Sequence, residues 1–320
     1  MAKISVITCT AKAAPNLERM AECLRSQTYT DFEWLIVDRL LPKRGEDYYK
    51  GLQDLSMFDI NIVAPKKSIY HDFNLPDISN ARNTGIIYSA GDILVWYDDN
   101  MWIPANYLEK HINMHAIIGS ESYCVGLFWP FSNWDNVLDF SKQEPYDKYG
   151  NFCREGSFND NNPDTTHGIR PDDNRAYMEF PQDLSMRQYS PYETVKGSWC
   201  YNGNLSFTLS LALKLNGYDE HLDGTFGGED VNFGVRADNA GATGILDRSC
   251  CAYDYRGVEN DSISDIMPFN WYHIGEMNGT KLTRREFDMV SIQHTPSRYR
   301  ENAYFCLKDF RDTCKKGENI

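Results

Sequence analysis

Two adjacent carboxylates and an amide, Asp98-Asp99-Asn100, directly follow the apolar run at residues 93–97. A short apolar run of this kind is typical of a buried strand, and ligands in open α/β sheets bind just beyond the carboxyl ends of the strands. Adjacent carboxylates repel each other unless a cation neutralises them, and oxygen ligands suit Mg²⁺ or Mn²⁺. The segment therefore predicts a divalent metal ion that also holds the phosphates of a substrate, with a solvated turn as the alternative.

Strand and helix patterns alternate through the first hundred residues. Strands separated by helices predict a mostly parallel sheet with right-handed crossovers, an architecture typical of nucleotide binding. Gly91 follows the last of these helices and is expected to stop it. Hydrophobic periodicity predicts strands at residues 4–8, 32–37, 60–63 and 93–97, helices at residues 15–27, 48–55 and 79–89, and later a helix at residues 231–241 and a strand at residues 245–253.

Residues 128–198 mix Trp, Phe and Tyr with Asn, Asp, Pro and Gly and have little periodicity. A long irregular segment inside a compact domain is usually functional or disordered, and the density of aromatic residues argues against disorder. We therefore expect one α/β domain at residues 1–255 with this segment as an insert. Residues 256–320 are expected to form an extension that packs on the domain through an amphipathic stretch.

The chain has 320 residues, and 46 acidic against 32 basic residues give a net charge of −14. This balance argues against nucleic-acid binding, which relies on Lys and Arg to neutralise phosphates. No apolar run of about 18 residues predicts a membrane span, and the N-terminus enters a strand pattern without the apolar core of a signal peptide. Nine cysteines without a Cys-x-x-Cys pair favour reduced thiols and a cytoplasmic protein.

Several segments, in this order along the chain, resemble the family-2 glycosyltransferases with the GT-A fold. The resemblance covers about residues 1–255 apart from the insert, and its later part is also similar to galactosyltransferase-type catalytic domains. It implies a GT-A, Rossmann-like, mixed and mostly parallel sheet flanked by helices, with an acceptor-side insert and a C-terminal helical extension. The matching segments are residues 4–10, residues 24–33, Ala81-Arg82-Asn83-Thr84-Gly85, Asp98-Asp99-Asn100, residues 202–207, Gly217-Tyr218-Asp219-Glu220 and Gly227-Gly228-Glu229-Asp230.

The resemblance implies a donor site for a nucleotide-sugar and a metal ion, Mn²⁺ or Mg²⁺. The family's Asp-x-Asp motif falls on Tyr97-Asp98-Asp99, so Tyr97 replaces the first carboxylate and Asp99 becomes the direct metal ligand. The residues expected to bind the nucleotide-sugar are Thr10, Asp38, Arg82 and Asp98, and those expected to bind the metal are Asp99 and Asp254, with His273, His294 or water as alternatives to Asp254.

The identity of the nucleotide base is left open by the sequence. The family often has two successive Asp residues after its second strand, whereas this chain has Asp38-Arg39. The resemblance favours UDP, with GDP or another nucleotide as alternatives.

The acceptor side carries the second carboxylate pair, Glu229-Asp230, after two glycines. Glycine lets backbone approach closely, and the start of a helix favours a charged carboxylate. The resemblance implies that Asp230 is the base that deprotonates the acceptor hydroxyl and that Glu229 orients the acceptor, a glycan or glycoconjugate. A single base implies direct displacement with inversion. The alternative is that both residues only cap the helix expected from Val231.

Three alternative functions agree less well with the sequence. A non-catalytic GT-A-like module that binds a nucleotide or sugar is permitted by Tyr97 and Arg39, but Asp99 and Asp230 together argue against it. A nucleotidyltransferase needs a glycine-rich, basic phosphate loop after the first strand, which residues 11–15 do not provide. A glycosyltransferase acting on modified DNA is disfavoured by the acidic balance.

Overall fold

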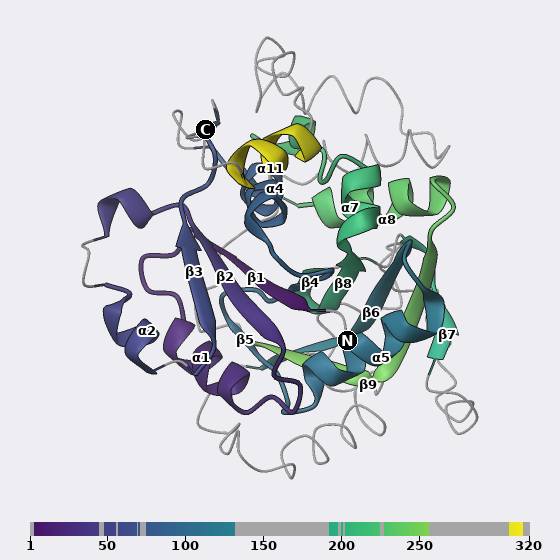
Figure 1. Cartoon of the computed structure of the whole chain (residues 1–320), viewed down its shortest axis with the longest axis horizontal. Helices are drawn as coiled ribbons and strands as arrows, with labels where there is room; N and C mark the ends of the chain where they lie inside the picture. Colours follow the sequence, from purple (N-terminus) through teal and green to yellow (C-terminus); the bar gives the residue numbers. More distant parts are fainter. Residues whose placement is uncertain are drawn as a thin grey trace, which may run out of the picture.

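The computed structural model describes residues 3–44, 48–55, 57–68, 70, 75–131, 192–197, 200, 202–224, 227–255 and 307–315. Its strands form one mixed sheet of nine strands in the order β3-β2-β1-β4-β8-β6-β9-β5, with β7 paired to β9 (Figure 1). The strands are β1 (Ile4–Thr10), β2 (Phe32–Asp38), β3 (Asp59–Val63), β4 (Ile93–Trp96), β5 (Met101–Trp102), β6 (Ser122–Phe131), β7 (Tyr192–Thr194), β8 (Leu205–Thr208) and β9 (Thr243–Tyr255).

Helices cover both sides of the N-terminal strands. β1 pairs in parallel with β2 and with β4, and β2 pairs in parallel with β3, which confirms the expected alternation. In Figure 1, α1 and α2 lie on one side of these strands and α4 on the other. The helices are α1 (Leu17–Arg25), α2 (Lys50–Leu55), α4 (Ile78–Tyr88), α5 (Tyr107–Ile118), α7 (Leu209–Lys214), α8 (Glu229–Asn239) and α11 (Leu307–Lys315), with short 3-10 turns η1 (Leu41–Lys43), η7 (Asn202–Asn204) and η8 (Glu220–Leu222).

The chain reverses its direction across the sheet between β1 and β4. β2 and β3 lie on one side of β1, and β4 lies on the other. In a doubly wound sheet this reversal opens a crevice beyond the carboxyl ends of the two strands, where ligands bind. The fold therefore puts the polar residues that follow β1 and β4 at the edge where such a crevice forms.

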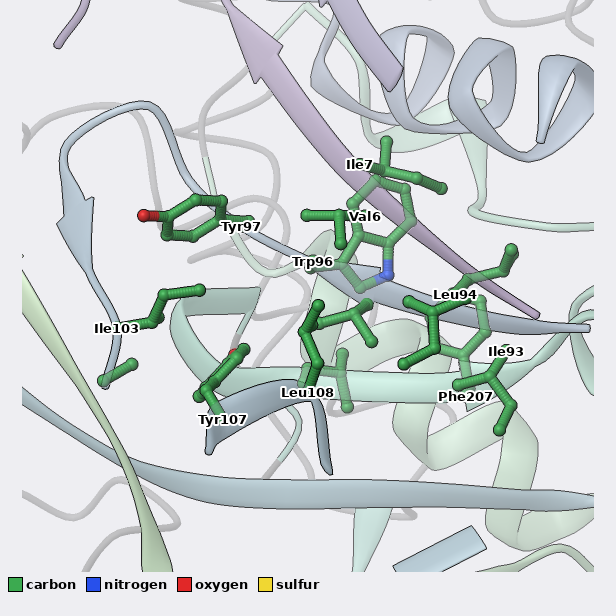
Figure 2. Close-up of a cluster of buried hydrophobic side chains, with 14 of the residues drawn as sticks. Val6, Ile7, Ile93, Leu94, Trp96, Tyr97, Ile103, Tyr107, Leu108 and Phe207 are labelled. Carbon is green, nitrogen blue, oxygen red and sulfur yellow. The ribbon is translucent and has the colours of Figure 1, made fainter. Parts of the chain in front are cut away.

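The apolar runs predicted as strands form the core of the sheet. All four residues of β4 are buried, and Figure 2 shows Trp96 and Leu94 beside Val6 and Ile7 of β1. Phe207 of β8 extends this cluster, and β8 runs antiparallel to β4, which makes the sheet mixed. Near-continuous apolar strands are typical of sheets covered on both faces, so the sequence pattern and the packing agree.

Helix α4 is held at both of its ends by distant side chains. At its start, the Asp223 carboxylate accepts hydrogen bonds from Ser79 N at 2.8 Å and Asn80 N at 3.0 Å. At its end, Arg311 of α11 donates to Ile86 O at 2.6 Å and Ile87 O at 3.0 Å. A carboxylate at the start of a helix and a cation at its end both match the helix dipole. These contacts fix the helix that carries Arg82.

Regular structure reaches into both ends of the segment predicted to be irregular. β6 continues to Phe131, and residues 192–194 form β7. Residues 132–191 lie outside the described part of the chain. Among the helices that the structure describes, none combines the length and the apolar character that a membrane span requires.

Gly91 does not end α4 in the way the sequence suggested. The helix ends at Tyr88, and Ser89 follows in an extended conformation. Gly91 instead lies against the backbone of β1, where a Cβ atom would meet Ser5 N at 2.5 Å and Lys3 O at 2.7 Å. The position requires glycine because the turn into β4 packs directly on the neighbouring strand.

Gly91→Ala is therefore expected to destabilise the fold. The added methyl group must push rigid backbone apart, and overpacking of this kind costs about 1–3 kcal/mol of unfolding free energy. Gly51→Ala is the matched control, because a Cβ atom there meets nothing within 4 Å. Urea unfolding should show a lower midpoint for Gly91→Ala and an unchanged or higher one for Gly51→Ala. Equal midpoints in the two variants would contradict this packing.

Candidate functional site

Thr10 connects two of the carboxylates predicted at the sheet edge. Its Cα is the register partner of Asp38 at the end of β2. Its hydroxyl donates to Asp99 Oδ2 at 2.6 Å, across the point where β1 and β4 end. Thr10, Asp38 and Asp99 therefore lie at the same edge of the sheet, as the sequence predicted.

The second oxygen of Asp99 forms an ion pair that sequence reasoning missed. Lys12 Nζ lies 2.8 Å from Asp99 Oδ1, and the Asp99 side chain is 10% exposed while that of Lys12 is 50% exposed. Asp98, next to it, is half-buried. The only signal in the sequence was a basic residue two positions after Thr10, which by itself indicates nothing.

Tyr97, which stands where the family has its first motif carboxylate, belongs to the core. Figure 2 shows its ring near Ile103 among buried apolar side chains. Its hydroxyl donates to Met101 O at 3.0 Å, and burial raises its pKa well above the ordinary value. This position therefore faces away from any metal at Asp99, and the motif is reduced to Asp98 and Asp99.

The residues at this edge fit a divalent ion that is shared with a substrate. Among the described residues, no three His, Cys, Asp or Glu side chains are grouped to hold a metal. Mg²⁺, however, is usually bound by one or two carboxylates together with substrate phosphates and waters. The hard oxygens of Asp98 and Asp99 suit such an ion. Asp99 already binds one positively charged group, the Lys12 ammonium.

The predicted additional metal ligands are only partly described. Asp254 lies on β9, where its backbone is the register partner of Met101 on β5, two residues after Asp99. The position of its side chain lies outside the described part of the structure, and His273 and His294 lie outside the described residues altogether.

The Asp38 carboxylate is fully engaged inside the protein. It is completely buried and accepts from Leu40 N at 2.9 Å, from Tyr49 Oη at 2.8 Å, and from Nε and Nη2 of Arg44. A carboxylate has about four lone-pair sites, and these four donors occupy them. Arg44 also donates to the backbone oxygens of Lys12 and Ala13. Asp38 therefore anchors Arg44, and through it the loop that follows β1.

Helix α8 begins at Glu229, two residues before the predicted start at Val231. Gly227 and Gly228 both have φ of 86°, in the left-handed region that glycine adopts at little cost, and they turn the chain directly into the helix. Glu229 and Asp230 thus form the first turn of α8. The Asp230 carboxylate accepts from Val231 N at 2.8 Å and from Asn202 N at 3.2 Å.

The environment of Asp230 raises its pKa to about 7. Burial is the largest cause, because it disfavours the charged form, and the negative charge of Glu229 adds to it. Arg82 and the two backbone N–H groups act in the opposite direction. A carboxyl group with a pKa near neutrality is suited to accept a proton at neutral pH, since the best general bases have a pKa close to the working pH.

Arg82 joins helix α4 to the first turn of α8. It is buried on α4, and its Nη1 donates to Glu229 Oε1. The guanidinium lies over the rings of Trp96, at 5.9 Å, and Tyr218, at 5.4 Å from the ring centroids. Asn202 completes the cluster: with its amide oxygen toward Arg82 it accepts at 2.6–3.0 Å, and its nitrogen donates to Tyr218 Oη at 2.8 Å.

Asn202 and Tyr218 were matched by sequence only as parts of motifs, and neither was predicted to act at the site. The only signal for them in the sequence was that they lie in two of the segments that resemble the family, residues 202–207 and Gly217-Tyr218-Asp219-Glu220. The contact of Arg82 with Glu229 joins residues that are 147 positions apart, so it follows from the topology and not from any local pattern.

The sequence profile described as "Glycosyl transferase family 2" matches residues 5–177. A comparison with curated proteins finds no match.

Many solved structures share the fold, and three of them show how low the sequence identity is. GalNAc-T7 with UDP, GalNAc and Mn²⁺ is 13% identical, with a TM-score of 0.55 over 98% of this chain and 55% of that one. The mannosyltransferase PcManGT of Pyrobaculum calidifontis with GDP-Man and Mn²⁺ is 12% identical, with a TM-score of 0.51 over 99% and 74%. TarS 1-349 of S. aureus with UDP is 13% identical, with a TM-score of 0.50 over 90% and 69%. The chain thus spans about half the length of the GalNAc-T7 structure, and the likeness is one of GT-A fold.

Proposed function

The chain belongs to glycosyl transferase family 2, and from that premise we propose that it transfers a sugar from a nucleotide-sugar donor to a hydroxyl group of a glycan or glycoconjugate. The proposal rests on the presence of two sets of carboxyl groups, one after β4 and one at the start of α8. Asp98 and Asp99 follow β4 at the edge of the sheet where doubly wound folds bind ligands, and Asp230, a carboxyl group with a pKa raised to about 7, shares a cluster with Arg82 beside β4.

The donor is proposed to bind across the ends of β1, β2 and β4. Thr10, Arg82 and Asp98 form the nucleotide-sugar site, and Asp38 supports it by holding Arg44 and the loop after β1. Asp99, with Asp254, holds Mn²⁺ or Mg²⁺. When bound there, a divalent cation offsets the negative charge that develops on the departing diphosphate. GalNAc-T7 and TarS were solved with UDP, which supports UDP as the first choice, while PcManGT holds GDP-Man.

The acceptor is proposed to bind beside the start of α8. Asp230 accepts the proton of the attacking hydroxyl, and Glu229, held by Arg82, orients the acceptor. A single base implies direct displacement with inversion at the sugar carbon. We further propose that residues 1–255 form the catalytic domain and that residues 128–198 shape acceptor binding.

Sugar transfer is expected to become faster as the pH rises through about 7. Asp230 must be unprotonated to act as a base, and its pKa is raised to about 7. The effect on stability has the opposite sign. Because folding raises the pKa of Asp230, the folded state binds this proton more tightly than the unfolded state does, and the stability gained in this way is lost as the pH rises through about 7. A pH profile of kcat/KM that is flat across neutrality in saturating metal would contradict the role of Asp230.

The proposed function is tested by offering the protein a panel of nucleotide-sugar donors. The full chain is incubated with UDP-, GDP- and dTDP-sugars in Mn²⁺ or in EDTA, and both donor binding and nucleoside diphosphate release are measured. Metal-dependent turnover of one donor supports the proposal and identifies the nucleotide. Tight binding without turnover, even with candidate acceptors present, favours the binding module, and binding of no donor overturns the assignment.

A further inference from the structure

Both oxygens of the Asp99 carboxylate are already engaged by the protein. Oδ2 accepts from Thr10 Oγ1 at 2.6 Å, and Oδ1 lies 2.8 Å from the Lys12 ammonium. A divalent cation that binds Asp99 must come close to that ammonium. Because both groups are positive, a metal ion and Lys12 cannot share Oδ1, and one of them must leave it.

The backbone of Lys12 is fixed although its side chain is half-exposed. Lys12 N donates to Thr10 Oγ1 at 3.3 Å, and its carbonyl oxygen accepts from Arg44 Nη2. Arg44 is itself held by Asp38, which Tyr49 and Leu40 also contact. The loop after β1 is therefore anchored to a saturated, fully buried carboxylate. This anchoring keeps the Lys12 side chain within reach of Asp99 and of the crevice beside it.

We propose that Lys12 is a positioning residue that occupies Asp99 in the absence of substrate and moves to the diphosphate of the donor when the metal binds. This inference rests on the proposed function, because it assigns the diphosphate as the anion that receives the ammonium. Without a diphosphate, a metal ion that displaces Lys12 leaves the ammonium beside a cation. With a diphosphate present, the displaced ammonium gains a new partner. Metal and nucleoside diphosphate therefore bind cooperatively, each favouring the same position of Lys12.

Removal of the Lys12 ammonium should change the affinity for Mn²⁺ and the affinity for the nucleoside diphosphate in opposite directions. Lys12→Met removes the competitor of the metal, so the affinity for Mn²⁺ alone is expected to rise about fivefold, the size expected for loss of an ion pair near the surface. The same variant removes a ligand of the diphosphate, so the affinity for UDP or GDP in saturating Mn²⁺, where the metal already holds Asp99, is expected to fall by about the same factor. Loss of structure around Asp99 would instead weaken both.

The experiment has two parts. Mn²⁺ is titrated into the full chain without nucleotide, following the EPR signal of the free ion, and UDP and GDP are titrated calorimetrically in saturating Mn²⁺. Lys12→Arg keeps the charge and should retain both wild-type affinities. Lys214→Met is the matched control, because it removes another exposed lysine–carboxylate pair, with Glu121 at 2.6 Å, away from the crevice.

The inference is overturned if Lys12→Met leaves the Mn²⁺ affinity unchanged or lowers it, or if UDP and GDP bind the variant as tightly as the wild type. Failure of the proposed function is a separate result: a wild-type chain that binds neither nucleotide in any condition. In that case the Mn²⁺ titration still tests whether Lys12 competes with a metal for Asp99, and an unchanged affinity there rejects that part on its own.

Discussion

Asparagine in place of Asp230 is expected to slow sugar transfer by about 10²–10⁴-fold, the usual contribution of a general base, while leaving donor affinity unchanged. The substitution removes the ability to take the hydroxyl proton but preserves the shape of the side chain. Its carbonyl oxygen still accepts a hydrogen bond from Val231 N or Asn202 N, so the first turn of α8 should be retained. The rate and the donor dissociation constant are measured on the same preparation.

Asp238→Asn provides the control for this prediction. Asp238 lies on the same helix and also accepts two hydrogen bonds, from Tyr123 Oη at 2.6 Å and Gly197 N at 2.7 Å, but it lies at the other end of α8. Its replacement should affect stability more than turnover. If Asp230→Asn transfers sugar at the wild-type rate, or if Asp238→Asn loses as much activity, Asp230 is not the base.

Asp99→Asn is expected to weaken donor binding in Mn²⁺ by at least about 100-fold and so to abolish most of the affinity that the metal adds. Even groups that only support a metal ligand are worth about 10–100-fold, and Asp99 is proposed to bind the metal directly. The neutral amide cannot offset a divalent charge, and it also releases the Lys12 ammonium. The hydroxyl of Thr10 can still donate to the amide oxygen, so the edge of the sheet should stay folded. Calorimetric titration of the donor with and without Mn²⁺ measures the change.

The control is Asp92→Asn, an exposed carboxylate at the opposite end of β4. This variant should bind donor and metal like the wild type. Metal-dependent binding that survives in Asp99→Asn would remove Asp99 from the metal site. Together, Asp99→Asn and Asp230→Asn should separate binding from turnover, because each acts on a different side of the reaction.

The sequence was informative wherever one residue type in one local pattern has a structural meaning. Apolar runs of strand length predicted β1, β2 and β4, and an acidic pair after such a run predicted the edge where Asp98 and Asp99 lie. The two glycines before Glu229 indicated a close turn into a helix, although the helix begins two residues earlier than its apolar periodicity suggested. Polar residues in a first turn carry no periodic signal, and this explains the error.

The contacts between distant segments could not be predicted. Lys12 meets Asp99, and Arg44 meets the loop after β1, because the carboxyl ends of neighbouring strands converge in space. Arg82 was predicted to bind the donor, but its contact with Glu229 depends on how α4 and α8 pack. Gly91 illustrates the same limit: a glycine after a helix is typical of a stop, yet here it allows close packing on β1.

In the proposed reaction one carboxylate base, Asp230, acts on an acceptor that attacks the donor sugar directly. Proton NMR of the sugar product, recorded before its anomers equilibrate, tests this most directly, with water as the acceptor if no better one is known. We predict that the product first appears with the anomeric configuration opposite to that of the donor. A product that first appears with the configuration of the donor would contradict the direct displacement and the role of Asp230 in it.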